Sequence, residues 1–263
     1  MPIPFLAPDD ELTPFPDVSS ALTEPDGLLM AGGNLAPRRL LSAYRAGVFP
    51  WYEAGEPILW WSPDPRCVIW PEDIHVTRSL AKTLRSGRYH VTENVAYRDV
   101  MKHCGAPRPG SSGTWITDEM TEAYCTLNRF GLARSIEVWM ERRLVGGLYG
   151  IVLGQVFVGE SMFSLERDAS KVALVHLARS GEYRLIDCQL ETPHLASMGA
   201  TCIRRARYIE LLAEFGEVPS DVLSASAARE RGAAEGGPAP GATPPADAPT
   251  RSLSGRSGRP PLR

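Results

Sequence analysis

Residues 135–161, SIEVWMERRLVGGLYGIVLGQVFVGES, change the hydrophobic period of the chain to two and thereby decide its fold class. The runs of strand-forming residues cover 135–140, 144–153 and 156–161. Between them stand Glu141-Arg142-Arg143 and Gly154-Gln155, which are long enough only for tight turns. The segment therefore predicts three consecutive antiparallel strands.

Patterns typical of helices and further strands surround this meander. Helices are expected over residues 37–46, 77–87, 94–105, from 117 onward, over 169–178, at 194–198 and over 207–215. Thr77, Asn94 and Thr117 are the expected N-caps of the second, third and fourth of these helices. Further strands are expected over residues 67–70, 185–189 and 201–203. Helices combined with an antiparallel meander predict an α+β protein with a mixed, largely antiparallel sheet.

Length and composition are those of a globular protein with a full core. The chain has 263 residues, of which 43% are hydrophobic and 22% charged. Residues 224–263 contain no aromatic residue and no Ile, Val or Met, so we expect a disordered tail there. The net charge of −3 does not indicate a polyanionic partner. Any contact with nucleic acid would have to come from a local basic patch.

The cysteines and the N-terminus indicate a reducing compartment. Cys67, Cys104, Cys125, Cys188 and Cys202 are odd in number and widely spaced, which argues against a disulfide framework or a zinc site. No apolar run reaches the roughly 20 residues that span a bilayer. The first residues, MPIP, lack the basic and apolar regions of a signal peptide. We therefore expect a cytoplasmic protein without a membrane span.

Two polar residues share the expected strand at 185–189. Asp187 and Gln189 lie two residues apart, which places their side chains on one face, about 7 Å from each other. One interpretation is a satisfied polar pair at the edge of a sheet. The other is a pair that faces a cleft and acts on a substrate, because a carboxylate and a carboxamide are costly to bury without partners.

The run VGESMFS at residues 158–164 adds a third polar candidate. Glu160 ends an otherwise apolar strand, and Gly159 before it would let another backbone approach closely. A rim carboxylate without a role is the alternative interpretation. The chain contains none of the common phosphate-loop, dinucleotide, zinc-protease or nucleophile-elbow motifs. The scattered histidines also suggest no metal site.

Several long strings together resemble the leucyl/phenylalanyl-tRNA–protein transferases. The strings are DGLLMAGGNL (26–35), GVFPW (47–51), ILWWSPDPR (58–66), GTWI (113–116), SIEVW (135–139), VGGLYG (145–150), GESMFS (159–164) and LIDCQ (185–189). They occur in the order of that family and span about residues 13–215. The tail after residue 224 lies outside the resemblance.

The resemblance implies a fold and an activity. A small N-terminal domain would cover residues 1–62, and a domain like the GCN5-type N-acyltransferases would cover residues 63–218. The family is bacterial and cytoplasmic. It transfers Leu or Phe, with Met as a further donor, from aminoacyl-tRNA to the α-amino group of proteins that begin with Arg or Lys, which marks them for degradation. No cofactor or metal is implied, and we expect a monomer.

The resemblance also assigns site residues. Asp187 and Gln189 match the catalytic pair, and Glu160 matches the supporting acidic residue. The apolar pocket for the aminoacyl side chain is matched by Leu148, Phe157, Met162, Leu174 and Ile186. Positions near the terminal adenosine are matched by Trp51, Trp115 and Tyr124. The resemblance does not assign residues to the tRNA phosphates. We expect these contacts from a basic face formed by Arg66, Arg78, Lys82 and Arg85.

Details of the strand at 185–189 leave other functions open. Strict alternation would place Ile186 opposite Asp187, so a bulge or a pocket that wraps around the strand edge is required. The link at residues 179–183 is shorter than is usual in the family, and Thr192 stands where some members carry Asn. A catalytically inactive relative that binds tRNA or peptide is therefore an alternative. A CoA-dependent N-acetyltransferase and a peptidoglycan-type aminoacyltransferase are further alternatives, but the motifs do not suit them.

Overall fold

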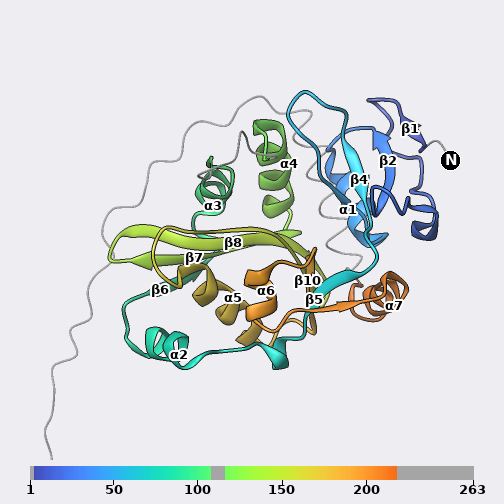
Figure 1. Cartoon of the computed structure of the whole chain (residues 1–263). Helices are drawn as coiled ribbons and strands as arrows, with labels where there is room; N and C mark the ends of the chain where they lie inside the picture. Colours follow the sequence, from blue (N-terminus) through green and yellow to red (C-terminus); the bar gives the residue numbers. More distant parts are fainter. Residues whose placement is uncertain (1–2, 108–115, 218–263) are drawn as a thin grey trace, which may run out of the picture.

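The structure is a computed structural model that describes residues 3–107 and 116–217 (Figure 1). The described strands are β1 (Phe5–Leu6), β2 (Leu28–Gly32), β3 (Phe49–Pro50), β4 (Leu59–Trp61), β5 (Arg66–Ile69), β6 (His90–Glu93), β7 (Ala133–Met140), β8 (Arg143–Leu153), β9 (Val156–Ser164), β10 (Leu185–Gln189) and β11 (Thr201–Ile203). The helices are α1 (Pro37–Arg45), α2 (Arg78–Arg85), α3 (Tyr97–Cys104), α4 (Asp118–Arg129), α5 (Ala169–Arg179), α6 (Pro193–Ser197) and α7 (Arg205–Phe215), with 3₁₀ turns at Val18–Ser20 and Pro71–Asp73.

The larger sheet has the strand order β11-β5-β10-β9-β8-β7-β6. β7, β8 and β9 pair antiparallel as neighbours, which confirms the predicted meander. β10 lies parallel to β9 and antiparallel to β5, so the sheet is mixed and largely antiparallel, as an α+β fold requires. β6 was not predicted, because its sequence HVTE holds a single aliphatic residue and gives no alternating pattern.

Helices cover both faces of the larger sheet (Figure 1). On one face α3 and α4 contact the meander, and on the opposite face α5 contacts the same strands. Each face has its own hydrophobic cluster: Met101 and Met120 belong to the first, and Val172 and Leu174 to the second. The strands of the meander are therefore buried on both sides, and polar groups within them need partners.

The smaller sheet, with the order β1-β2-β4-β3, is joined to the larger one through a shared core. Trp60 of β4 is fully buried and donates from its indole nitrogen to the Gly32 carbonyl at 2.9 Å. One hydrophobic cluster contains Trp60 of β4, Tyr44 of α1 and Tyr124 of α4. The expected boundary between units at residues 1–62 and 63–218 stays a prediction.

Two of the three expected helix caps are confirmed. The hydroxyl of Thr77 accepts a hydrogen bond from Leu80 N, and that of Thr117 accepts one from Met120 N. The prediction for Asn94 is wrong, because α3 begins after Ala96. Asn94 has a φ of +56°, and its side-chain oxygen Oδ1 accepts a hydrogen bond from the backbone N–H of Ser135. Its side chain therefore holds β7 and not a helix end.

Gly150, more than Gly159, permits close approach of neighbouring backbone in the meander. A Cβ atom on Gly150 would lie 2.2 Å from the carbonyl oxygen of Val158, whereas one on Gly159 would lie 3.4 Å from that of Asp187, an ordinary contact. Within residues 3–107 and 116–217, no helix is long and apolar enough to cross a membrane. The expected disordered tail, 224–263, lies outside the described residues.

Candidate active site

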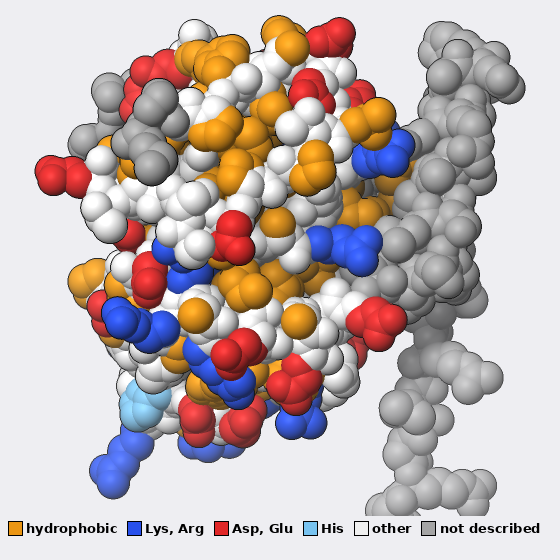
Figure 2. All heavy atoms as spheres, turned by 90° about the vertical axis from the view of Figure 1, so that its right-hand side faces the viewer, with side chains coloured by type: hydrophobic (Ala, Val, Ile, Leu, Met, Phe, Trp, Pro, Cys, Tyr) orange, Lys and Arg blue, Asp and Glu red, His pale blue; other side chains and the backbone are white. Residues whose placement is uncertain are grey.

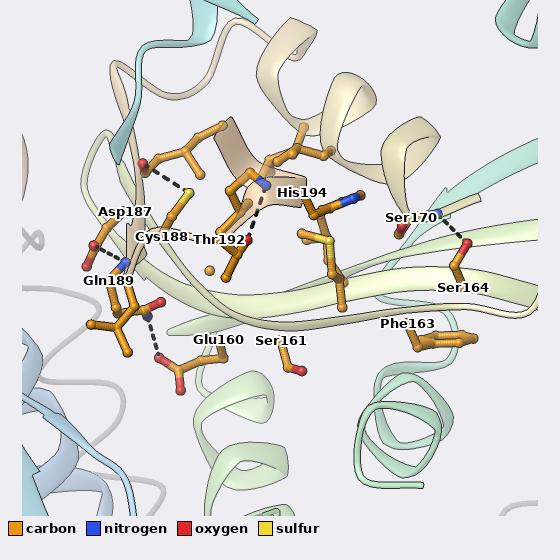
Figure 3. A pocket seen from close by; sticks show the side chains of 18 of the residues that line it. Glu160, Ser161, Phe163, Ser164, Ser170, Asp187, Cys188, Gln189, Thr192 and His194 are labelled. Carbon is orange, nitrogen blue, oxygen red and sulfur yellow. Dashed lines mark hydrogen bonds between the residues drawn. The ribbon is translucent and has the colours of Figure 1, made fainter. Parts of the chain in front are cut away.

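A pocket of about 780 Å³ opens where β9 and β10 meet α5, α6 and the edge of the smaller sheet (Figure 3). Its size is typical of small-molecule sites, which enclose about 300–1,000 Å³. The three predicted polar residues, Glu160, Asp187 and Gln189, all contribute to its lining. The structure therefore brings together side chains from two neighbouring strands that were candidates from the sequence.

Asp187 is fully buried, and both of its carboxylate oxygens are engaged. Arg66 donates to it twice, from Nε to Oδ1 at 2.8 Å and from Nη2 to Oδ2 at 2.7 Å. The Tyr208 hydroxyl donates to Oδ2 at 2.9 Å, and the Gln189 backbone N–H donates to Oδ1 at 2.9 Å. Such a bidentate pair with two further donors holds the carboxylate in one orientation. Asp187 is thus a fixed anchor.

Arg66 lies inside the protein and not on the predicted basic face. Its side chain is 1% exposed, and its guanidinium lies between the rings of Phe49 and Tyr208, 4.8 and 4.5 Å from their centroids. It also donates to the Gly47 carbonyl at 3.2 Å. The expectation that Arg66 contacts tRNA phosphates is therefore wrong, because its charge is enclosed and paired with Asp187.

The strand bends at Gln189. Its φ is +56°, and the pairing of β10 with β5 shifts register between Asp187 and Gln189. The sequence required either a bulge or a pocket that wraps around the strand edge. The observed register shift lies after Asp187, while the adjacent Ile186 and Asp187 both line the pocket. The Gln189 carboxamide nitrogen points toward Glu160, 3.5 Å from its Oε1 (Figure 3).

Glu160 has neutral hydrogen-bond partners. The Tyr124 hydroxyl donates to its Oε2 at 3.3 Å and also shares a hydrogen bond with the Tyr44 hydroxyl. Burial raises the pKa of Glu160 to about 7, the hydroxyl of Tyr44 counteracts this rise, and the charge of Asp187 adds to it. Near neutral pH this carboxyl group can therefore both take up and release a proton.

The predicted apolar residues form one recess of the pocket. Leu148, Phe157, Met162, Leu174 and Ile186 all line it. Leu148 and Met162 are paired across β8 and β9, and Phe157 and Ile186 are paired across β9 and β10. Leu174 comes from α5, so the recess is enclosed by the sheet on one side and a helix on the other.

The structure describes two of the three residues predicted near an adenosine, Trp51 and Tyr124. Trp51 is 45% exposed and lines the rim of the pocket, with its ring 5.8 Å from that of Trp61. Tyr124 is fully buried, with its hydroxyl against Glu160, and its expected place near the adenosine stays a prediction. Its ring packs against neighbouring tyrosines in the core. Trp115 lies outside the described residues.

The rest of the predicted basic face lies on α2. Arg78, Lys82 and Arg85 are exposed there, on a helix at one end of the larger sheet (Figure 1). A different face, turned by 90°, shows acidic and basic side chains scattered around apolar ones (Figure 2). The basic side chains drawn for the described residues form no continuous field on that face. The α2 face therefore remains the candidate for phosphate contacts.

Sequence reasoning missed two residues of this site, Tyr44 and Tyr208. Both are fully buried, and each places a hydroxyl group in the polar network around Glu160 or Asp187. Tyr44 lies on the buried face of α1 beside Leu40 and Ala43. A tyrosine on such a face produces the same pattern whether or not its hydroxyl has a polar partner, so no sequence signal distinguishes the two cases. Among the residues with described positions, no cluster of His, Cys, Asp or Glu could hold a metal ion.

The matching family models and the curated relatives agree on one family. A family model described as leucyl/phenylalanyl-tRNA protein transferase matches residues 68–213, and the model of that family's N-terminal domain matches residues 33–64. The leucyl/phenylalanyl-tRNA–protein transferase of Nitrosomonas europaea is 53% identical over 210 residues, which cover 79% of this chain and 89% of that protein. The protein of the same name from Chromohalobacter salexigens is 58% identical over 208 residues, 78% of this chain and 81% of that protein. Among solved structures, a GCN5-related N-acetyltransferase from Kribbella flavida has a TM-score of 0.33 at 8% identity, covering 65% of this chain and 62% of that chain.

Proposed function

The chain belongs to the leucyl/phenylalanyl-tRNA–protein transferase family of aminoacyltransferases, and we propose that it transfers Leu, Phe or Met from aminoacyl-tRNA to the α-amino group of proteins that begin with Arg or Lys. The transfer marks the acceptor for degradation. The protein acts in the cytoplasm as a monomer and without a cofactor.

The observation that carries this proposal is the continuity of the pocket. An apolar recess lined by Leu148, Met162 and Leu174 joins directly to the polar groups of Glu160 and Gln189. An aminoacyl side chain in the recess would place its ester carbonyl beside these polar groups. Shape alone should discriminate against branched alternatives by about 1–3 kcal/mol. The flexible side chain of Met162 is suited to unbranched or γ-branched residues.

The reaction places modest demands on the protein. The aminoacyl ester is already activated, and the attacking α-amine, with a pKa of about 7.7–8.0, is partly neutral in the cell. Alignment of amine and ester supplies several kcal/mol. We assign this alignment to Gln189, whose bent backbone is held by Asp187. The Gln189 carboxamide would also donate to a developing oxyanion, a kind of contact worth about 10²–10³-fold in rate.

The tRNA would approach from the rim of the pocket. Trp51 presents an exposed indole there, which is suited to stacking on the terminal base. Arg78, Lys82 and Arg85 on α2 would neutralise phosphates farther along the acceptor stem, so binding should weaken steeply with salt.

The test uses purified protein, Leu-charged tRNA and a peptide that begins with Arg. Labelled Leu is followed onto the peptide, beside a matched peptide that begins with Glu. Transfer confined to the Arg peptide supports the proposal, and Asp187→Ala should abolish it because Gln189 loses its anchor. A wild-type protein that binds the charged tRNA but transfers nothing would contradict the proposal and favour the inactive binding relative.

A further inference from the structure

Of the described residues that line the pocket, Glu160 and Asp187 are those with carboxyl groups, and they differ in availability. Asp187 already accepts hydrogen bonds from Arg66, Tyr208 and the Gln189 backbone, and its side chain is fully buried. A substrate proton could reach its oxygens only by displacing these donors. Glu160 is partly exposed to the pocket.

The hydrogen bonds to Glu160 leave it able to change partners. The donors at 3.3 Å from Tyr124 and 3.5 Å from Gln189 are neutral and lie at the long end of hydrogen-bond distances. The side chain extends from β9 toward Gln189 (Figure 3), and the same pocket is lined by the residues of the apolar recess. An acceptor amine that attacks an ester in this recess would approach Glu160 and Gln189 together.

We propose that Glu160 is the catalytic residue that accepts the proton from the acceptor amine, and that Tyr44 and Tyr124 are positioning residues that hold its carboxylate. The inference rests on the proposed function and adds a role for the N-terminal helix α1, which supplies Tyr44. Asp187 then acts on Gln189 and not on the proton.

The step balances without a further reactant. The neutral amine nitrogen forms a bond to the ester carbonyl carbon, and its proton passes to a Glu160 oxygen. The bond between that carbon and the ribose oxygen then breaks, and the same proton passes from Glu160 to the leaving oxygen. Glu160 returns to the carboxylate, and the products are a peptide bond and a ribose hydroxyl.

Charged and titratable groups around Glu160 come from every element packed against it. They are Tyr44 on α1, Arg66 on β5, Tyr97 on α3, Tyr124 on α4, Tyr149 on β8 and Asp187 on β10. Burial and the Asp187 charge keep the pKa of Glu160 near 7, while the hydroxyls of Tyr44 and Tyr124 and the charge of Arg66 lower it. The carboxylate form is therefore lost as pH falls below about 7.

The experiment measures the transfer rate at low acceptor concentration from pH 5 to 9, with Leu-charged tRNA saturating. Below both pKa values the wild-type rate should fall 100-fold per pH unit, since Glu160 and the amine must each lose a proton. In Glu160→Gln the rate should be lower by about 10² or more, and it should fall only tenfold per unit. Binding of a 3′-amide analogue of leucyl-adenosine checks that the pocket is intact.

The tyrosines supply variants that keep the carboxylate. Tyr44→Phe and Tyr124→Phe remove hydroxyls that lower the pKa of Glu160, so its midpoint in the rate profile should move to higher pH. Tyr149→Phe is the matched control: it is equally buried, and its hydroxyl has no hydrogen-bond partner in the described part of the chain. Its profile should stay in place.

The outcomes separate the two proposals. Absence of transfer by the wild-type protein would overturn the proposed function and this inference with it. Normal transfer with an unchanged rate and slope in Glu160→Gln would overturn the inference alone. If the tyrosine variants were slower by one factor at every pH, without a shift of the midpoint, their positioning role would be wrong.

Discussion

The two carboxylates of the pocket sit in opposite environments. Asp187 is paired with a buried guanidinium and receives a hydrogen bond from Tyr208, whereas Glu160 faces phenols and a carboxamide. The first environment sets an opposite charge and further hydrogen-bond donors against the negative charge of Asp187. The second leaves a charge partly uncompensated, which is visible in the pKa of about 7 for Glu160.

This difference shows that the two carboxylates of the site have different roles, one in holding the structure and one in chemistry. The carboxylate of Asp187 has a structural role, because it accepts a hydrogen bond from the Gln189 backbone N–H and so holds the chain there. An uncompensated one is reactive, but it makes the folded state less stable whenever it is charged. Stability and reactivity are thus assigned to adjacent strands, β10 and β9. The three predictions below test this division.

The largest effect should come from breaking the buried pair. Arg66→Met leaves Asp187 buried beside neutral donors, and loss of one partner of such a pair costs about 3–5 kcal/mol. Urea denaturation at pH 7 should show this loss in the free energy of unfolding. Arg78→Met, on the exposed face of α2, is the control and should stay within about 0.5 kcal/mol of the wild type.

A second variant makes the interpretation unambiguous. Arg66→Met combined with Asp187→Leu removes both charges and should recover much of the lost stability, because apolar replacement of a whole buried pair is often nearly neutral. If the single variant were as stable as the wild type, Asp187 would not depend on Arg66, and the contrast between the two carboxylates would fail.

The second prediction concerns the pH dependence of stability. The pKa of Glu160 rises from 4.5 to about 7 on folding, so its protonated form is favoured in the folded state. Its stabilising contribution is full below pH 4.5 and is lost as pH rises through about 7, a change of about 3 kcal/mol.

Glu160→Gln removes this titration. Relative to the wild type, the variant should therefore gain about 3 kcal/mol between pH 5 and pH 8.5, measured as the difference in unfolding free energy in urea. Glu191→Gln, which changes an exposed carboxylate, should show no comparable gain. If the difference in unfolding free energy between Glu160→Gln and the wild type were equal at both pH values, ionisation of Glu160 would not destabilise the folded state.

Much of this arrangement could be predicted from local sequence. The alternation in residues 135–161 predicted the meander, and β10 and β11 were predicted with the bounds that the structure has. Local pattern also placed Gln189 at the end of β10, whereas the expected strand end near Glu160 is wrong, because β9 continues to Ser164. These features depend on neighbours a few residues apart, which a sequence displays directly.

Long-range partners could not be predicted in the same way. Arg66 and Asp187 are 121 positions apart, and nothing in either segment indicates that the other neutralises it. Arg66 therefore looked like a surface cation. Asn94 looked like a helix cap for a similar reason, since its real acceptor role toward Ser135 depends on the pairing of β6 with β7. The resemblance identified Tyr124 as a site residue, but only the structure shows that its hydroxyl lies against Glu160.

The smallest expected effect lies at the junction of the two environments. Gln189 adopts a φ of +56°, a conformation that glycine accepts more readily than residues with a Cβ. Gln189→Gly should therefore be more stable than Gln189→Ala by about 1 kcal/mol, measured by urea denaturation. At the exposed helical position Ala213 the order reverses, and Ala213→Gly should cost about 1 kcal/mol. If alanine were favoured at both positions, the backbone at residue 189 would leave its positive φ once the glutamine side chain is removed. The bend would then not be held by Asp187, and the anchoring role that distinguishes this carboxylate from Glu160 would have to be abandoned.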